Sequence, residues 1–185
     1  MREESRGSDV RQAFERIVLP HLDAAYNLAR WLVRNPQDAE DVVQEACLRA
    51  LRFLGGYQGG DARSWVLRIV RNTAYSFLEK QRPSELAEEF DETIHVAEED
   101  PPAAEAALLQ SAESRIIQET LEGLPIRFRE ALILRELEGL SYKEIAEVME
   151  IPIGSVMSAL ARGRARLREG LLRTRDGEVQ RGLRR

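Results

Sequence analysis

The sequence LSYKEIAEVMEIPIGSVMSALARGRARL, residues 140–167, decides the fold of this chain and predicts two short helices joined by a tight turn. Ser141 and Glu144 fit a capping box, in which a hydroxyl and a carboxylate each accept a backbone N–H at a helix start. The second helix has an apolar or small residue at every third or fourth position, which makes one inward stripe. These residues are Val156, Leu160, Gly163 and Leu167. The stretch therefore predicts a helix–turn–helix.

The other face of this second helix is expected to lie outward and to carry small and basic side chains. Its members are Gly154, Ser155, Ser158, Ala159 and Arg162, followed by Arg164, Arg166 and Arg168. A helical hairpin inside an ordinary core would have the same spacing. The run of arginines favours DNA instead, because basic residues on one helix face provide phosphate contacts beside the major groove.

Composition excludes several classes of protein. With 185 residues the chain is long enough for one or two domains with real cores. It has no apolar run long enough to span a membrane and no apolar signal region at its start, so we expect no membrane insertion. The lone Cys47 excludes an internal disulfide framework and fits a reducing cytoplasm. Together with only His21 and His95 it forms no recognisable zinc site, so we expect no metal and no cofactor.

Charge divides the chain into three parts. Residues 1–82 carry 13 basic and 11 acidic side chains, and residues 114–185 carry 14 basic and 11 acidic ones. Residues 83–113 carry 10 acidic side chains and no basic one, with three prolines. This composition predicts a flexible acidic linker between two domains. The linker is either a solvated connector or a segment that lies in a basic channel in place of nucleic acid.

The first part of the chain is expected to be helical. Residues 9–34 have apolar residues at helical spacing, and Pro20 should break or kink the run. Asn35 and Pro36 predict an N-cap and first turn for a helix that reaches about Leu54. Its expected inward residues are Val43, Ala46, Cys47, Ala50, Leu51 and Leu54, with Cys47 as a small core residue.

A glycine loop and a further helix follow. The loop GGYQGG, residues 55–60, cannot continue a helix and carries one aromatic residue, Tyr57. The helix over residues 62–81 should face inward with Trp65, Val66, Ile69, Val70, Thr73, Phe77 and Leu78. Its opposite side should carry Ser64, Arg68, Arg71, Tyr75 and Arg82, with Asn72 at the edge. Basic residues among aromatics suit single-stranded nucleic acid, although an ordinary amphipathic surface helix has the same pattern.

Three segments in this order resemble the extracytoplasmic-function sigma factors of bacterial RNA polymerase. They are DAEDVVQEACLRAL from residue 38, RSWVLRIVRNTA from residue 63, and the segment LPIRFREALILRELEGLSYKEIAEVMEIPIGSVMSALARGRARL from residue 124. The resemblance covers about Phe14 to Leu172. It implies an all-α fold with a region 2 bundle over residues 1–82, an acidic linker over 83–113 and a region 4 helix-turn-helix domain over 114–185.

The resemblance also implies a role for particular residues. Asp38, Asp41, Gln44, Glu45 and Arg49 match the segment that docks on the clamp of the polymerase largest subunit. Tyr57, Arg68, Arg71, Asn72 and Tyr75 match the surface that binds the melted −10 strand, with a flipped base captured near Tyr57. Ser155, Ser158, Arg162, Arg164 and Arg166 match the helix that reads the −35 duplex, while the block 124–137 would meet the polymerase flap.

The implied function is recruitment of core RNA polymerase to promoter DNA, without catalysis by this chain. An anti-sigma factor is the further expected partner, and the cytoplasm, at the nucleoid when active, is the expected location. Family members usually carry a basic residue where this chain has Met157, and often Arg where it has Ala159. A stand-alone helix–turn–helix regulator is the alternative, although such a regulator needs neither the first domain's acidic face nor its basic helix. A nucleic-acid enzyme would need an acid–base or metal cluster, which the sequence does not present.

Overall fold

The computed structural model describes residues 2–83, 86 and 112–182, and their side chains over residues 9–83, 86 and 115–174. Every element in these residues is a helix, so the prediction of an all-α fold is confirmed. Most of the predicted linker lies outside the described residues. Its last two positions, Ala112 and Glu113, already belong to a helix of the second domain.

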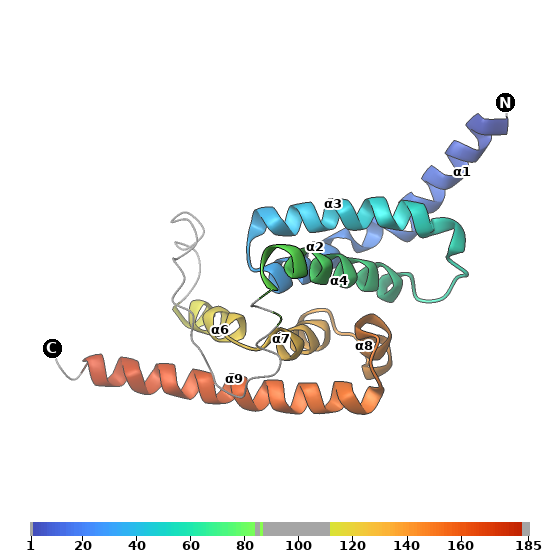
Figure 1. The fold of residues 1–185 in the computed structure, drawn as a ribbon. Coiled ribbons are helices and arrows are strands. Elements are labelled where there is room, and N and C mark those ends of the chain that lie inside the picture. The colour runs from blue at the N-terminus through green and yellow to red at the C-terminus, as the bar shows by residue number, and fades with distance from the viewer. Residues whose placement is uncertain (1, 84–85, 87–111, 183–185) are drawn as a thin grey trace.

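The first domain is a bundle of three packed helices with a fourth helix leading into it. Figure 1 shows α2, α3 and α4 packed together, while the start of α1 projects away from the body. The elements are α1 (Arg2–Ile17), the 3-10 turn η1 (Leu19–His21), α2 (Leu22–Val33), α3 (Pro36–Phe53), the 3-10 turn η2 (Leu54–Gly56) and α4 (Ala62–Gln81).

Local chemistry explains the boundaries of these helices. Pro20 lacks an N–H and falls in η1, so the chain breaks between α1 and α2 as predicted. The Asn35 side chain accepts from the backbone N–H groups of residues 37 and 38, which confirms the predicted N-cap of α3. Asp61 caps α4 in the same way, accepting from the N–H groups of Arg63 and Ser64 at 3.1 Å each. Sequence reasoning placed the start of α4 correctly but did not identify this cap.

The inward stripe of α3 is made of small residues, which let the helix lie close to α2 and α4. The stripe consists of Ala39, Val42, Ala46 and Ala50, each at most 3% exposed. Leu51 was predicted to face inward and is 38% exposed, so that prediction is wrong. The inward face of α3 is centred one residue earlier than the apolar pattern predicted. Small alanine side chains, and not the larger Leu51, occupy the space between α3 and its neighbours α2 and α4.

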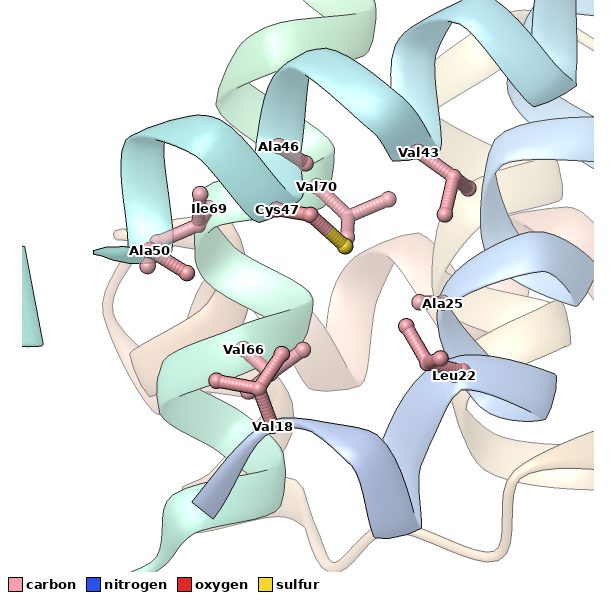
Figure 2. Close-up of a pocket in the computed structure, with 10 residues that line it drawn as sticks. All are labelled: Val18, Leu22, Ala25, Val43, Ala46, Cys47, Ala50, Val66, Ile69 and Val70. Atoms are coloured by element: carbon pink, nitrogen blue, oxygen red, sulfur yellow. The ribbon is translucent and has the colours of Figure 1, made fainter. Parts of the chain in front are cut away.

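Cys47 borders a small void in the core of the first domain. Figure 2 shows its sulfur directed between α3, α4 and the turn that leads into α2. The void measures about 10 Å³ and is lined by side chains such as Val18, Val66 and Val70. An apolar space of this size stays dry, so it is a packing gap and not a binding site. Burial raises the pKa of the Cys47 thiol.

The second domain packs three shorter helices against one long one. Figure 1 shows α9 running along α6, α7 and α8. Gly163 permits this close packing, because a Cβ there would lie 3.2 Å from the Leu132 side chain and 3.3 Å from the Phe128 carbonyl oxygen. The elements are α6 (Ala112–Glu122), α7 (Ile126–Leu132), the π-helical turn η4 (Ile133–Leu137), α8 (Tyr142–Met149) and α9 (Ile153–Gly182). The predicted helix–turn–helix is therefore α8 and the start of α9, with the predicted capping box present at Ser141 and Glu144.

The two domains pack directly against each other through α4 and α8, and through α2 and α7 (Figure 1). This contact changes the expected exposure of α4. Ser64 was predicted to lie on the open side of α4 and is only 4% exposed, so that prediction is wrong. Leu67 and Ala74, which the inward stripe did not include, are completely buried. Helical periodicity predicts a single buried face for a helix. Two faces of α4 are buried, because it packs against α2 and α3 and also against α8.

The capping box of α8 generates a prediction about acid stability. Hydrogen bonds from the Ser141 side chain and backbone lower the pKa of Glu144. A carboxylate with a lowered folded pKa contributes stability above its unfolded pKa, about 4.3, and loses it as the pH falls through the folded value. We expect Glu144→Gln to lower the Tm by a few degrees at neutral pH, and the difference from the wild-type Tm to disappear as acid protonates Glu144. Thermal unfolding at a series of pH values measures this, with Glu147→Gln, an exposed acid on the same helix, as the control. A Tm difference that persists in acid would contradict the assignment.

The burial of Cys47 predicts an unreactive thiol. Because its pKa is raised, little thiolate forms near neutral pH, and the side chain is also half-buried. We expect alkylation by iodoacetamide at about pH 8 to be at least about tenfold slower than for an exposed thiol, and to accelerate in denaturant. The comparison variant is Leu48→Cys in a Cys47→Ala background, since Leu48 is 50% exposed on the same helix. Equal alkylation rates for the two thiols would show that the core of the first domain opens readily.

Candidate nucleic-acid and polymerase interfaces

The residues predicted to dock on polymerase lie along one side of α3. Asp41 and Gln44 are exposed, and Leu48, which the sequence analysis did not include, continues the same side at 50% exposure. The Arg49 guanidinium lies 2.8 Å from the Glu45 carboxylate, and this hydrogen bond lowers the pKa of Glu45. Asp38 differs from the others, because its carboxylate binds Arg82, which follows α4, at 3.0 Å. The face is therefore acidic and amide-bearing, with the exposed Leu48 and Leu51 among its polar side chains.

The glycine loop between α3 and α4 has a defined shape with Tyr57 at its centre. The Tyr57 hydroxyl donates to the Gly60 carbonyl at 2.8 Å, and its ring lies 5.1 Å from the Trp65 ring. Gly59 and Gly60 have φ values of +88° and +100°, which favour glycine at these two positions. Trp65 packs against the core and supports the loop from below. Two aromatic rings thus lie together at the start of α4.

Three of the α4 residues predicted to bind the melted strand contact the second domain instead. Arg71 Nε donates to Glu130 of α7 at 2.6 Å, and the Tyr75 hydroxyl donates to the other oxygen of the same carboxylate at 2.8 Å. Asn72 Nδ2 donates to Glu150, which follows α8, at 3.1 Å. For Arg68, the fourth residue, the described part of the chain shows no hydrogen bond or ion pair. The structure therefore places Arg71, Asn72 and Tyr75 together where the second domain contacts α4, whereas Tyr57 lies apart in the glycine loop.

The contact between Arg71 and Glu130 is largely buried. The Glu130 side chain is completely buried and that of Arg71 is 17% exposed. Burial, the largest single influence, would lower the pKa of Arg71, but Glu130, Tyr75 and Glu150 together outweigh it and raise that pKa. The guanidinium also lies 4.4 Å from the centre of the Tyr75 ring. Arg71, Tyr75 and Glu130 thus form one buried polar cluster that belongs to both domains.

A second contact between the domains is built around Glu138, which directly follows η4. Its carboxylate accepts from Asn27 of α2 at 2.8 Å and from Arg63 of α4. The π-helical geometry is visible in the hydrogen bond from the Glu138 N–H to the Ile133 carbonyl, five residues earlier, at 3.0 Å. The Glu138 side chain is 6% exposed, so its charge depends on these two partners. Arg129 adds a third contact, donating to the Leu32 carbonyl of α2 at 3.4 Å.

The start of α9 presents the residues predicted to read duplex DNA. Ser158 and Arg162 are exposed and Ser155 is partly exposed. The Ser158 hydroxyl donates to the Gly154 carbonyl at 2.9 Å. Met157 is 54% exposed on the same part of the helix. Ala159 was placed on the outward face and is 2% exposed, so that prediction is wrong, and the methyl group packs inward.

Two of the predicted arginines already have partners within the domain. Arg164 lies 2.7 Å from the Glu136 carboxylate, a contact that raises the pKa of Arg164. The guanidinium of Arg166 lies 5.0 Å from the centre of the Phe128 ring. Arg162 has no hydrogen bond or ion pair within the described residues, and its charge faces solvent. The three arginines are therefore not equivalent.

Sequence reasoning missed the residues that join the domains, namely Asn27, Arg63, Arg129, Glu130, Glu138 and Glu150. One signal was present, because Arg129 and Glu130 directly precede the apolar run ALIL, residues 131–134. Both are completely buried. A charged pair beside an apolar run indicates partners on another element, although it does not identify them. Among the described residues there is no cluster of side chains that could hold a metal, and none of the described helices could cross a membrane.

Comparison with known proteins agrees with this arrangement. The family model for sigma-70 region 2 matches residues 17–83, and that for sigma-70 region 4 matches residues 114–167. The ECF RNA polymerase sigma-E factor of Haemophilus influenzae is 40% identical over 146 residues, covering 74% of this chain and 75% of that protein. The RNA polymerase sigma-H factor of Pseudomonas aeruginosa is 38% identical over 169 residues, covering 87% of each. The chain belongs to the ECF sigma factors.

Solved structures of other sigma factors have the same fold. The sigma factor RpoE, solved in complex with the anti-sigma factor NepR from Bartonella quintana, aligns with a TM-score of 0.66 and 28% identity. This alignment covers 85% of the present sigma factor and 96% of RpoE. CnrH, solved with the cytosolic domain of CnrY, aligns with a TM-score of 0.62 and 25% identity, covering 89% and 90% of the two chains. The family assignment disfavours the stand-alone regulator, because the region 2 match accounts for the first domain.

Proposed function

We propose that this sigma factor recruits core RNA polymerase and reads two promoter elements, the −35 element as duplex and the −10 element as a melted strand. The observation that carries the proposal is the presence of both matched domains, in family order, each with a polar surface of the kind that its role requires. The chain supplies recognition, while the chemistry of RNA synthesis belongs to the polymerase.

The first domain is proposed to bind the melted −10 strand through α4 and the preceding loop. The rings of Tyr57 and Trp65 lie 5.1 Å apart and offer an aromatic platform for an unstacked base. Arg68 and Arg71 would bind phosphates, with Asn72 and Tyr75 beside them. Extruding a base costs a few kcal/mol, which stacking and phosphate contacts offset. The acidic face of α3 would meanwhile hold the polymerase clamp, with Leu48 as an apolar anchor among its charges.

The second domain is proposed to place the start of α9 in the major groove at the −35 element. Ser155, Ser158 and Arg162 would face the bases, since small hydroxyls and one free guanidinium suit base edges. Arg164 and Arg166 would contact flanking phosphates, and Arg164 would have to leave Glu136 to do so. The buried Ala159 cannot contribute, so Met157 is the departure from the family pattern that should alter −35 recognition.

Regulation and location follow from the family. The solved relatives in complex with NepR and CnrY support the proposal that an anti-sigma factor holds this chain silent. We place its activity in the cytoplasm, at the nucleoid, where core polymerase and promoter DNA are found.

In vitro transcription tests the proposed function. Core RNA polymerase would be incubated with a promoter library, with and without this protein, and the transcripts sequenced. We expect new transcripts whose start sites share two spaced upstream elements. Specific duplex binding by the protein alone, with no transcription that depends on core polymerase, would instead establish a stand-alone regulator.

Arg162 provides a sharper test of the −35 contact. We expect Arg162→Ala to weaken binding of holoenzyme to a selected promoter about tenfold or more and to relax base preference at one −35 position. Arg173→Ala is the matched control, since Arg173 is an exposed arginine on the same helix whose partner is Glu169. Binding would be measured by fluorescence anisotropy over a range of salt concentrations. Equal losses of promoter affinity for the two variants would show that Arg162 contributes only its positive charge and no specific base contact.

A further inference from the structure

We propose that the free sigma factor inhibits itself, with carboxylates of the second domain occupying the −10 surface in place of strand phosphates. Glu130 and Glu150 occupy that surface, while Glu138 joins the domains beside it through Asn27 and Arg63, and we term the three together the carboxylate clasp. The inference rests on the proposed role of α4 in binding the melted strand. It adds that this surface is closed in the free chain and opens only when the domains separate.

The clasp uses the chemistry that a phosphate backbone would use. Arginine binds carboxylate and phosphate oxygens through the same N–H groups, and the amide of an asparagine donates to either. Glu130 places one oxygen on Arg71 and the other on Tyr75, so the carboxylate occupies both donors at once. Glu150 occupies Asn72 in the same way. Three of the four proposed −10 residues on α4 thus have an acidic partner from the second domain.

Occupation by the clasp and by DNA is mutually exclusive. Because the Glu130 side chain is completely buried and that of Arg71 is 17% exposed, a phosphate cannot reach Arg71 while the domains remain packed. Separation would have to come first, and it would leave the three carboxylates in water. In contact with DNA the same carboxylates would repel the strand, so the open state has to move them away from α4.

Two backbone features of the second domain place carboxylates at the contact with the first domain. The π-helical turn η4 ends at Leu137, and the next residue, Glu138, reaches Asn27 and Arg63. Glu150 stands at the end of α8 with a φ of +54°, a position that usually favours glycine. A charged residue in this conformation, directed to Asn72, indicates that the side chain serves a purpose beyond ending the helix.

The exposed edge of the contact between the two domains allows the domains to separate. Arg63 keeps 35% exposure of its side chain while bound to Glu138, so solvent and salt weaken this pair. Core polymerase could therefore separate the domains by binding each of them elsewhere. A closed state that dominates in the free chain reduces the apparent affinity for DNA by the fraction of molecules that are open.

The test removes the clasp charges without touching the DNA-binding residues. The variant Glu130→Gln/Glu138→Gln/Glu150→Gln keeps side-chain size and replaces each carboxylate by an amide. We expect this variant, without polymerase, to bind a fluorescent mixed-sequence single-stranded DNA at least about tenfold more tightly than the wild type. Small-angle X-ray scattering should show a larger radius of gyration for the variant, which reports opening independently of DNA.

A charge-matched control separates opening from electrostatics. The variant Glu119→Gln/Glu147→Gln/Glu169→Gln removes the same number of charges from exposed positions of the second domain. We expect at most about a twofold gain in affinity from its changed charge. Equal gains for both triple variants, or no gain for the clasp variant, would overturn the proposal.

A reversible cross-link tests the same idea in the opposite direction and does not depend on the stability of the triple variant. Asn27→Cys and Glu138→Cys, in a Cys47→Ala background, would be joined by a short bis-methanethiosulfonate reagent that bridges the two domains. We expect the joined protein to lose single-stranded DNA binding and transcription with core polymerase, and thiol reduction to restore both. Full activity of the joined protein would overturn the proposal.

Failure of the unjoined wild type to support any transcription would instead refute the sigma function, and the scattering result would still stand.

Discussion

A buried carboxylate needs hydrogen-bond partners wherever it lies in a fold. In this sigma factor Glu130 is such a carboxylate, and the arrangement of the two domains depends on it. It lies on α7, completely buried, and its two oxygens are bound by Arg71 and Tyr75 of the other domain. Removing one partner from such a group is costly, whereas the intact pair contributes little net stability. The contact therefore specifies how the domains fit together more than it strengthens the fold. Leu67 and Ala74 of α4 are completely buried as well.

The α4 residues that are proposed to bind DNA also hold the two domains together. Arg71 and Asn72 each lie about one helical turn before Tyr75, so all three border one side of α4, and that side suits any extended array of oxygens. Phosphates along a DNA strand and carboxylates on α7 and after α8 both provide such an array. A single surface can therefore serve two occupants at different stages of initiation, provided that the domains can separate. The two solved relatives, RpoE with the anti-sigma factor NepR and CnrH with the cytosolic domain of CnrY, show that proteins of this fold also bind a second chain.

Much of the fold could be predicted from the sequence, because local chemistry determines it. The break at Pro20, the Asn35 cap and the capping box at Ser141 each depend on a few neighbouring residues, and all are confirmed. The errors have a different cause. Leu51, Ser64 and Ala159 were assigned from helical periodicity, which gives the phase of a helix but not which of its sides another element covers. The contact between the domains joins residues far apart in the sequence, so no local pattern could reveal Glu138 beside Asn27. The assigned roles of the polymerase-binding and DNA-binding residues remain predictions.

The π-helical turn η4 lies where α7 ends and the chain turns toward the helix–turn–helix pair α8 and α9. A turn whose hydrogen bond spans five residues holds one residue more than an α-helical turn. The extra residue is contained within the turn, and α9 packs against α7, so deleting one residue from Ile133–Leu137 would change the shape of the turn before it changed the course of α8 and α9. Relatives that differ at this place by a single insertion can therefore keep the same packing of helices around a differently shaped turn.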